Sequence, residues 1–172
     1  MSHFRKDAAL NLQHTQLLVS VRNGAEIAPA IAGGCEILDF KDPGRGALGR
    51  VDDAILNTAI GYCQQYSVTI PLSMALGELC EWNTGQSSLS IPSEITFLKM
   101  GFSQCNGSPH WISDWQNLIQ RIEESSKHQH QWIAVAYADW RRANSLSPYK
   151  ILETACENGT AGLLIDTFSK QN

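Results

Sequence analysis

The feature that most constrains this fold is a repeated alternation of short apolar runs with segments of helical periodicity. The apolar runs are nearly continuous, which is typical of strands buried on both faces of a parallel sheet. Between them, apolar residues recur at helical spacing, as in Ile55, Ala59 and Cys63, and predict amphipathic helices. The predicted strands cover residues 15–22, 36–40, 68–75, 95–100, 132–138 and 161–166. The predicted helices cover residues 23–32, 51–66, 111–127 and 148–157.

Two parts of this pattern are less regular. Asn23 is a suitable helix cap, but Pro29 lies inside the first helix and predicts that its first part is irregular. Residues 78–92 fit either a short helix or a loop, because they combine Trp82 and Gly85 with several serines. The chain as a whole still indicates about six βα units.

Two architectures suit such a chain, a doubly wound open sheet and an eight-stranded (βα)8 barrel. Polar side chains at the ends of the predicted strands favour the barrel, because a barrel gathers all strand ends into one mouth. These residues are Ser20, Arg22, Asp39, Lys41, Ser73, Lys99, Asp139, Asp166 and Lys170. We therefore predict an α/β fold of the (βα)8 TIM-barrel type, with six units present and the last two missing.

The domain organisation follows from this prediction. Residues 1–14 are expected to be a polar lead-in, and residues 15–172 a single truncated barrel domain. A complete barrel usually runs to about 250 residues, so either the chain is a truncated product or the sheet stays open and relies on a partner chain. We expect a homo-oligomer.

Composition excludes several classes of protein. Of the 172 residues, 43% are hydrophobic and 17% charged, which suits one well-buried domain. The net charge of −4 argues against a nucleic-acid partner. No apolar run approaches the ~20 residues needed to span a bilayer, and the N-terminus does not resemble a signal peptide. The five cysteines form no Cys-x-x-Cys pair and indicate reduced thiols, so we expect a cytoplasmic protein without a membrane association.

Three lysines at strand ends are the candidates for chemistry: Lys41, Lys99 and Lys170. Burial and neighbouring positive charge both lower the pKa of a lysine, and a neutral amine can attack a carbonyl to form a Schiff base. Asp39 lies two residues before Lys41, so both side chains face the same way, and Asp39 and Asp166 could balance charge or transfer protons. Each lysine taken alone also fits an ordinary surface residue that follows a strand.

The glycine-rich stretch Gly44-Arg45-Gly46-Ala47-Leu48-Gly49 lies between a predicted strand and a predicted helix. It matches Gly-x-Gly-x-x-Gly, but no acidic residue ends the next strand, which argues against a dinucleotide site. The turn could instead present backbone amides to a substrate phosphate, or be an ordinary flexible turn. We expect no cofactor, and we assign substrate binding to Ser20, Arg22, Gly46 and Asp139.

The segment His128-Gln129-His130 could suggest a metal site. It sits in a polar connection between a helix and a strand, with no third ligand nearby, so we interpret it as a solvated loop. No metal ion is expected.

Residues 39–49, Asp-Phe-Lys-Asp-Pro-Gly-Arg-Gly-Ala-Leu-Gly, closely resemble the hallmark segment of the (5-formylfuran-3-yl)methyl phosphate synthase family. That enzyme is also called 4-(hydroxymethyl)-2-furancarboxaldehyde-phosphate synthase. The resemblance extends over residues 17–170, including residues 98–101, 136–139 and 164–167. One departure is Leu76-Gly77-Glu78-Leu79-Cys80, where the family usually has Gly-Asp-Val-Pro.

The resemblance implies a (βα)8 barrel that condenses two molecules of glyceraldehyde 3-phosphate to make the furan of methanofuran-type cofactors. By this resemblance Lys41 is the Schiff-base lysine, and Lys99 assists isomerisation or proton transfer. Asp39, Asp166 and Lys170 complete the implied site. Two alternatives stay open: another lysine aldolase on the same barrel, and a non-catalytic phosphate-binding or interaction module derived from the enzyme.

Overall fold

The computed structural model of the chain describes residues 15–84 and 91–169. The strands are β1 (Leu18–Val21), β2 (Ile37–Phe40), β3 (Leu72–Glu78), β4 (Ile95–Gly101), β5 (Gln131–Tyr137) and β6 (Gly162–Asp166). The α-helices are α1 (Ile27–Ala32), α2 (Asp53–Gln65), α3 (Trp111–Ser126) and α4 (Pro148–Glu157). Short 3-10 helices are η1 (Gly24–Glu26), η2 (Pro43–Arg45) and η3 (Leu79–Thr84).

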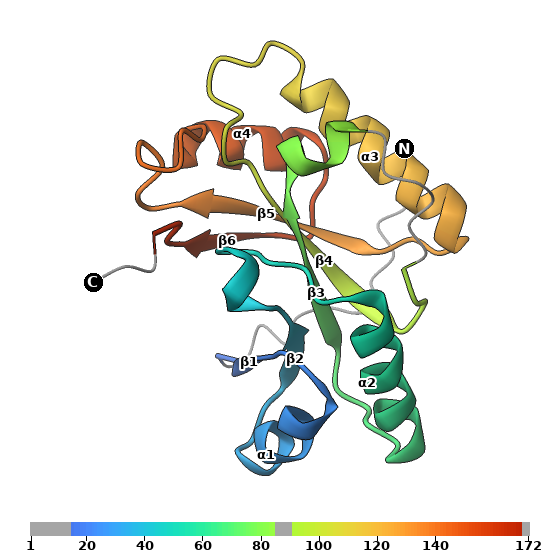
Figure 1. Cartoon of the computed structure of the whole chain (residues 1–172). Coiled ribbons are helices and arrows are strands. Elements are labelled where there is room, and N and C mark those ends of the chain that lie inside the picture. The colour runs from blue at the N-terminus through green and yellow to red at the C-terminus, as the bar shows by residue number, and fades with distance from the viewer. Residues whose placement is uncertain (1–14, 85–90, 170–172) are drawn as a thin grey trace.

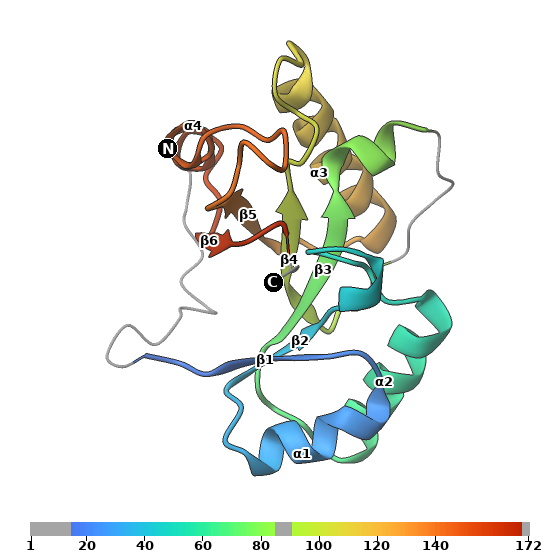
Figure 2. The ribbon, with the colours of Figure 1, turned by 60° about the vertical axis from the view of Figure 1, so that its left-hand side comes forward.

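The six strands form one parallel sheet in the order β1-β2-β3-β4-β5-β6. The sheet curls like part of a barrel, but within the described residues β1 and β6 are its two open edges (Figures 1 and 2). The prediction of a (βα)8 TIM barrel is therefore wrong, because closure requires the first and last strands to pair. The doubly wound alternative is wrong too, since the strand order never reverses.

The prediction failed for a physical reason. Polar residues at strand ends indicate only that these ends gather on one side, and a curled open sheet gathers them as a barrel does. Nothing in the local sequence of an edge strand states whether another strand pairs with it. Closure is a property of the whole sheet.

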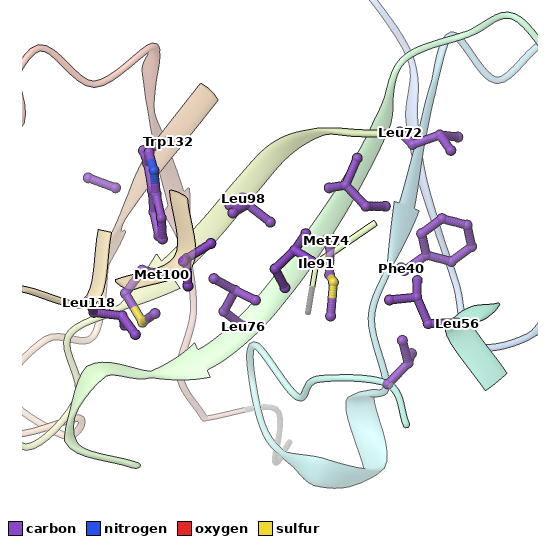
Figure 3. Close-up of a cluster of buried hydrophobic side chains, with 14 of the residues drawn as sticks. Phe40, Leu56, Leu72, Met74, Leu76, Ile91, Leu98, Met100, Leu118 and Trp132 are labelled. Carbon is purple, nitrogen blue, oxygen red and sulfur yellow. The ribbon is translucent and has the colours of Figure 1, made fainter. Parts of the chain in front are cut away.

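Side-chain alternation along the strands separates two faces of the sheet. The outer face carries Leu38, Met74, Leu98 and Trp132, which pack with residues of all four α-helices in the main core (Figure 3). The inner, concave face carries a smaller cluster of apolar residues from strands and loops. These residues are Ala47, Leu48, Ala75, Val135, Tyr137 and Ala143, with Trp140, Leu164 and Phe168 packed against them. Every second strand residue thus faces the concave side, where polar side chains can meet.

Most predicted elements are confirmed, with small shifts at their ends. The helix over residues 148–157 begins and ends as predicted, and Ser147 accepts the backbone N–H of Lys150. Asn23 caps η1, and the irregular start before α1 is confirmed as a 3-10 turn. The largest difference is the third strand, predicted over residues 68–75 but found at Leu72–Glu78.

One loop prediction needs correction. His130 is buried, and its Nδ1 lies 2.8 Å from the carbonyl oxygen of Ile95, so the segment 128–130 is only partly a solvated loop. Burial is the main cause of the lowered pKa of His130. The imidazole therefore joins the end of α3 to the start of β4.

Candidate active site

The deepest polar group of the concave face is an ion pair between Lys99 of β4 and Asp39 of β2. The Lys99 Nζ lies 2.5 Å from Asp39 Oδ2, and the Ser20 hydroxyl of β1 donates to the same oxygen over 2.7 Å. Asp39 is fully buried and Lys99 is 3% exposed. Ser20 and Asp39 are register partners on the neighbouring strands β1 and β2, and the Lys99 side chain reaches Asp39 from β4.

Burial lowers the pKa of Lys99, because a charged ammonium loses hydration inside the protein. The nearby charge of Lys41 lowers it further, whereas Asp39 and Asp166 oppose the shift. The two lysines predicted to share a pocket are therefore close enough for one to act on the other.

A second ion pair lies nearer the open side of the same face. The Lys41 Nζ, which follows β2, is 3.9 Å from Oδ2 of Asp166 at the end of β6, and both side chains are 17% exposed. This separation leaves room for the amine to move, whereas the Lys99 amine is held tightly. Lys41 is thus the more accessible of the two amines.

Internal hydrogen bonds hold the loop that follows Lys41. Asp42 caps the turn η2 by accepting the N–H of Gly44, and its own N–H donates to the carbonyl of Gly49. A Cβ at Gly49 would lie 2.1 Å from the Asp42 carbonyl oxygen, so this position requires glycine. Gly46 adopts a φ of 117° and its N–H donates weakly to Pro43. Several amides of this loop are used internally, so a substrate phosphate at Gly46 would compete with them.

The other predicted binding residues lie around the rim. Nε and Nη2 of Arg22 both donate to Oε1 of Glu26, in an ion pair at the exposed side of β1. Asp139 accepts the backbone N–H groups of Phe168 and Ser169, which lowers its pKa and holds the segment after β6. Lys170 lies outside the described residues. Among the predicted site residues that the structure describes, Ser20, Asp39, Lys41, Lys99 and Asp166 are the ones brought together most closely.

Two inward-facing polar residues were not predicted as site residues. Glu78 is 8% exposed, and its carboxylate accepts the Tyr137 hydroxyl and, over 2.8 Å, the backbone N–H of Ser103. Burial is the main cause of the raised pKa of both Glu78 and Tyr137, and the charge of Asp166 adds to each. Strand alternation could have indicated Tyr137. It could not indicate Glu78, because a register shift between Ala75 and Glu78 resets the alternation.

The described residues contain no group of three His, Cys, Asp or Glu side chains that could hold a metal ion. Nor is any helix in residues 15–84 and 91–169 both long and apolar enough to cross a bilayer. The polar side chains that meet on the concave face are the amines, carboxyls and hydroxyls described above.

A family model described as 4-HFC-P synthase matches residues 17–172. The chain belongs to the 4-HFC-P synthase family. The match covers every strand and helix of the fold, including the elements that carry Asp39, Lys41, Lys99 and Asp166. The resemblance found in the sequence is thereby confirmed.

Several curated relatives of this 4-HFC-P synthase family member carry the name (5-formylfuran-3-yl)methyl phosphate synthase. The protein of Archaeoglobus fulgidus is 23% identical over 159 residues, covering 90% of this chain and 66% of the relative. That of Methanothermobacter thermautotrophicus is 25% identical over 158 residues, covering 90% and 64%. That of Methanosarcina barkeri is 24% identical over 156 residues, covering 88% and 64%. The chain thus spans slightly less than two-thirds of the length of these relatives.

Proposed function

We propose that the chain carries the Schiff-base chemistry of a furan phosphate synthase. In this proposal, two molecules of glyceraldehyde 3-phosphate are condensed into 4-(hydroxymethyl)-2-furancarboxaldehyde phosphate for a methanofuran-type cofactor. The observation that carries the proposal is an accessible amine, Lys41, placed 3.9 Å from Asp166 and close to the buried Lys99–Asp39 pair. Membership of the 4-HFC-P synthase family supports the same chemistry.

Lys41 is the proposed nucleophile because its side chain is reachable from the concave side. The neutral amine attacks the aldehyde carbon of one triose phosphate, and loss of water gives an imine. Removal of a proton from the adjacent carbon converts the imine into an enamine, which adds to the aldehyde of the second triose phosphate. Loss of inorganic phosphate and of a second water molecule, with departure of the Lys41 amine, then closes the aromatic furan.

The remaining residues take proton-transfer and charge roles in this proposal. Asp166 lies beside Lys41 and can accept a proton from the amine before attack. Lys99 has a lowered pKa, so it can exchange a proton with Asp39 or with substrate. We assign Lys170 to the same site and Ser20, Arg22, Gly46 and Asp139 to substrate contacts.

The experiment is borohydride trapping with glyceraldehyde 3-phosphate, followed by peptide mass mapping. We expect a reduced adduct on Lys41 and none in the Lys41→Arg variant. Lys150→Arg is the matched control, because Lys150 is an exposed lysine on α4 whose amine contacts Glu153 over 2.8 Å. This variant is expected to trap substrate at the wild-type level.

The outcomes separate the alternatives. An adduct on Lys99 instead of Lys41 would exchange the roles of the two lysines. An adduct without the ultraviolet absorbance of a furan aldehyde would indicate another lysine aldolase. Binding of the triose phosphate without any adduct would indicate a non-catalytic module and overturn the proposed chemistry.

A further inference from the structure

A buried carboxyl that forms no ion pair with a basic residue of the described chain lies on the concave face, one layer above Lys99 on the side where the strands end. Glu78 is the register partner of Gly101, which follows Lys99 by two residues on β4 and so faces the same way. A Cβ at Gly101 would lie 2.4 Å from Glu78 Oε2 and 2.6 Å from the Tyr137 hydroxyl oxygen. The absence of a side chain at this glycine is what lets Glu78 and Tyr137 meet across β4.

The backbone conformation at the end of β3 turns the Glu78 side chain onto the concave face. The end of β3 is irregular, and Gly77 there adopts a φ of 86°. The backbone N–H of Glu78 donates to Glu81 Oε2 over 3.0 Å, which fixes the turn. The carboxyl is thereby rotated onto the inner face, although it follows Ala75 of that face by three residues.

The two carboxyl oxygens of Glu78 have different partners. Oε2 accepts the backbone N–H of Ser103 over 2.8 Å, so this oxygen stays an acceptor. Oε1 meets the hydroxyl of Tyr137, and a hydroxyl can either donate or accept. A proton on Glu78 therefore belongs on Oε1, between the carboxyl and the phenol.

The charges around Glu78 favour that proton. Within the described residues Glu78 forms no ion pair with a lysine, arginine or histidine, in contrast to Asp39 and Asp166. The negative charges of Glu81 and Asp166 raise the pKa of Glu78, and Tyr137, Cys80 and Cys105, which also interact with it, carry no positive charge. Ionisation at this place means a buried, unbalanced negative charge.

We propose that Glu78 and Tyr137 form a proton relay that serves the Lys41 site, an inference that rests on the proposed function above. Tyr137 is the register partner of Asp166, the residue paired with Lys41, so β5 and β6 place Tyr137 beside the carboxylate that contacts the reacting amine. Tyr137 delivers the proton, and Glu78 acts through it as a positioning and supplying residue.

In the dehydration that forms the imine, the relay supplies the proton with which the departing oxygen leaves as water. The nitrogen lone pair on Lys41 forms the C=N bond as the C–O bond of the adduct breaks, with the bonding electrons leaving on oxygen. The departing oxygen takes the Tyr137 proton and leaves as water, while Glu78 Oε1 returns a proton to the phenol oxygen. Glu78 becomes a carboxylate, and the imine nitrogen keeps the positive charge.

The test uses Glu78→Gln and Tyr137→Phe in the full 172-residue chain. The glutamine can fold in place, because its amide oxygen can accept from Ser103 while its NH2 donates to the Tyr137 oxygen. We expect each variant to slow borohydride trapping at Lys41 on the order of 10²-fold, the usual contribution of general acid catalysis. Wild-type trapping should slow as pH rises through the titration of Glu78, and Glu78→Gln should remove that decline. Glu157→Gln, an exposed carboxyl on α4, should trap like the wild type.

A spectroscopic measurement keeps the relay separate from the proposed function. We expect an infrared carboxylic-acid band at neutral pH that disappears in Glu78→Gln and shifts in Tyr137→Phe. If wild-type protein forms no adduct, the Schiff-base proposal fails, while this band still establishes Glu78 as a buried acid next to Tyr137. Wild-type trapping rates and pH profile in Glu78→Gln, or a spectrum without the band, would overturn the relay.

Discussion

The two lysine–aspartate pairs of the concave face have the same chemistry and different surroundings. Lys99 and Asp39 are 2.5 Å apart with side chains 4% and 0% exposed, whereas Lys41 and Asp166 are 3.9 Å apart and both 17% exposed. The dry pair is held by Ser20 and by its own strands. The wetter pair joins the residue after β2 to the last residue of β6 and is partly exposed to solvent. In the proposed chemistry, the dry pair sets the charge of the site and the wetter pair carries the reacting amine.

The largest effect should follow from breaking the dry pair. Asp39→Asn leaves the Lys99 ammonium buried without its counter-charge, and removal of one partner of a buried pair typically costs about 3–5 kcal/mol. Urea unfolding followed by circular dichroism measures the free energy of unfolding. Asp166→Asn is the matched variant at the wetter pair, and we expect a loss of about 1 kcal/mol or less. Equal losses in the two variants would erase the distinction between the pairs.

Chemical labelling should separate the two amines kinetically. Reductive methylation needs an accessible amine, so Lys99 must wait for a local opening while Lys41 reacts in the folded state. If the local opening that exposes Lys99 costs about 1.4 kcal/mol, Lys41 is methylated about tenfold faster than Lys99. A more costly opening increases this ratio of rates. Peptide mass mapping over time gives both rates, with the exposed Lys150 as the internal standard. Comparable rates at Lys41 and Lys99 would contradict the burial difference.

The loop that places Lys41 offers a third way to sharpen the comparison. Gly49→Ala drives a Cβ into the Asp42 carbonyl, and such overpacking destabilises by about 1–3 kcal/mol. Because Asp42 adjoins Lys41, the variant should also weaken trapping at Lys41 more than it disturbs the Lys99–Asp39 pair. Gly24→Ala is the control, since nothing lies within 4 Å of its added Cβ. A Gly49→Ala protein with wild-type stability would show that the loop can relax.

The smallest effect concerns Glu78, the inner carboxyl that has no ion-pair partner among the described residues. Its pKa is raised in the folded protein, chiefly by burial, so between the unfolded and folded values the native state binds more protons. The stability that Glu78 contributes is therefore complete below the unfolded pKa of about 4.3 and is lost as pH rises through the folded pKa. The slope cannot exceed about 1.4 kcal/mol per pH unit.

The contribution of Glu78 is measured as the difference in the free energy of unfolding between wild type and Glu78→Gln, followed across pH 4 to 8. Other titratable groups contribute equally to both proteins and cancel in this difference. His130 is one such group: burial lowers its pKa, so its contribution is lost as pH falls below about 6.5. A flat difference curve would mean that Glu78 titrates alike in the folded and unfolded chains.

Much of the fold could be predicted from the sequence, because each element depends on neighbouring residues. Continuous apolar runs indicated a parallel sheet, and the spacing of Asp39 and Lys41 indicated one shared face. The irregular start of the first helix was correctly predicted from Pro29: η1 precedes α1, and Pro29 lies within α1. Closure of the sheet was predicted wrongly, since it depends on what the edge strands β1 and β6 meet.

The candidate site likewise combines features that the local sequence determines with features that only the tertiary structure determines. The sequence alone determined which amines and carboxyls end the strands, because strand periodicity fixes the face of each residue from its immediate neighbours. Only the tertiary structure decided that Lys99 is the dry amine, since its partner Asp39 lies 60 residues away and burial is a sum over distant segments. The tertiary structure also decided that Glu78 faces inward, because the irregular end of β3 interrupts the alternation that sequence reasoning relies on.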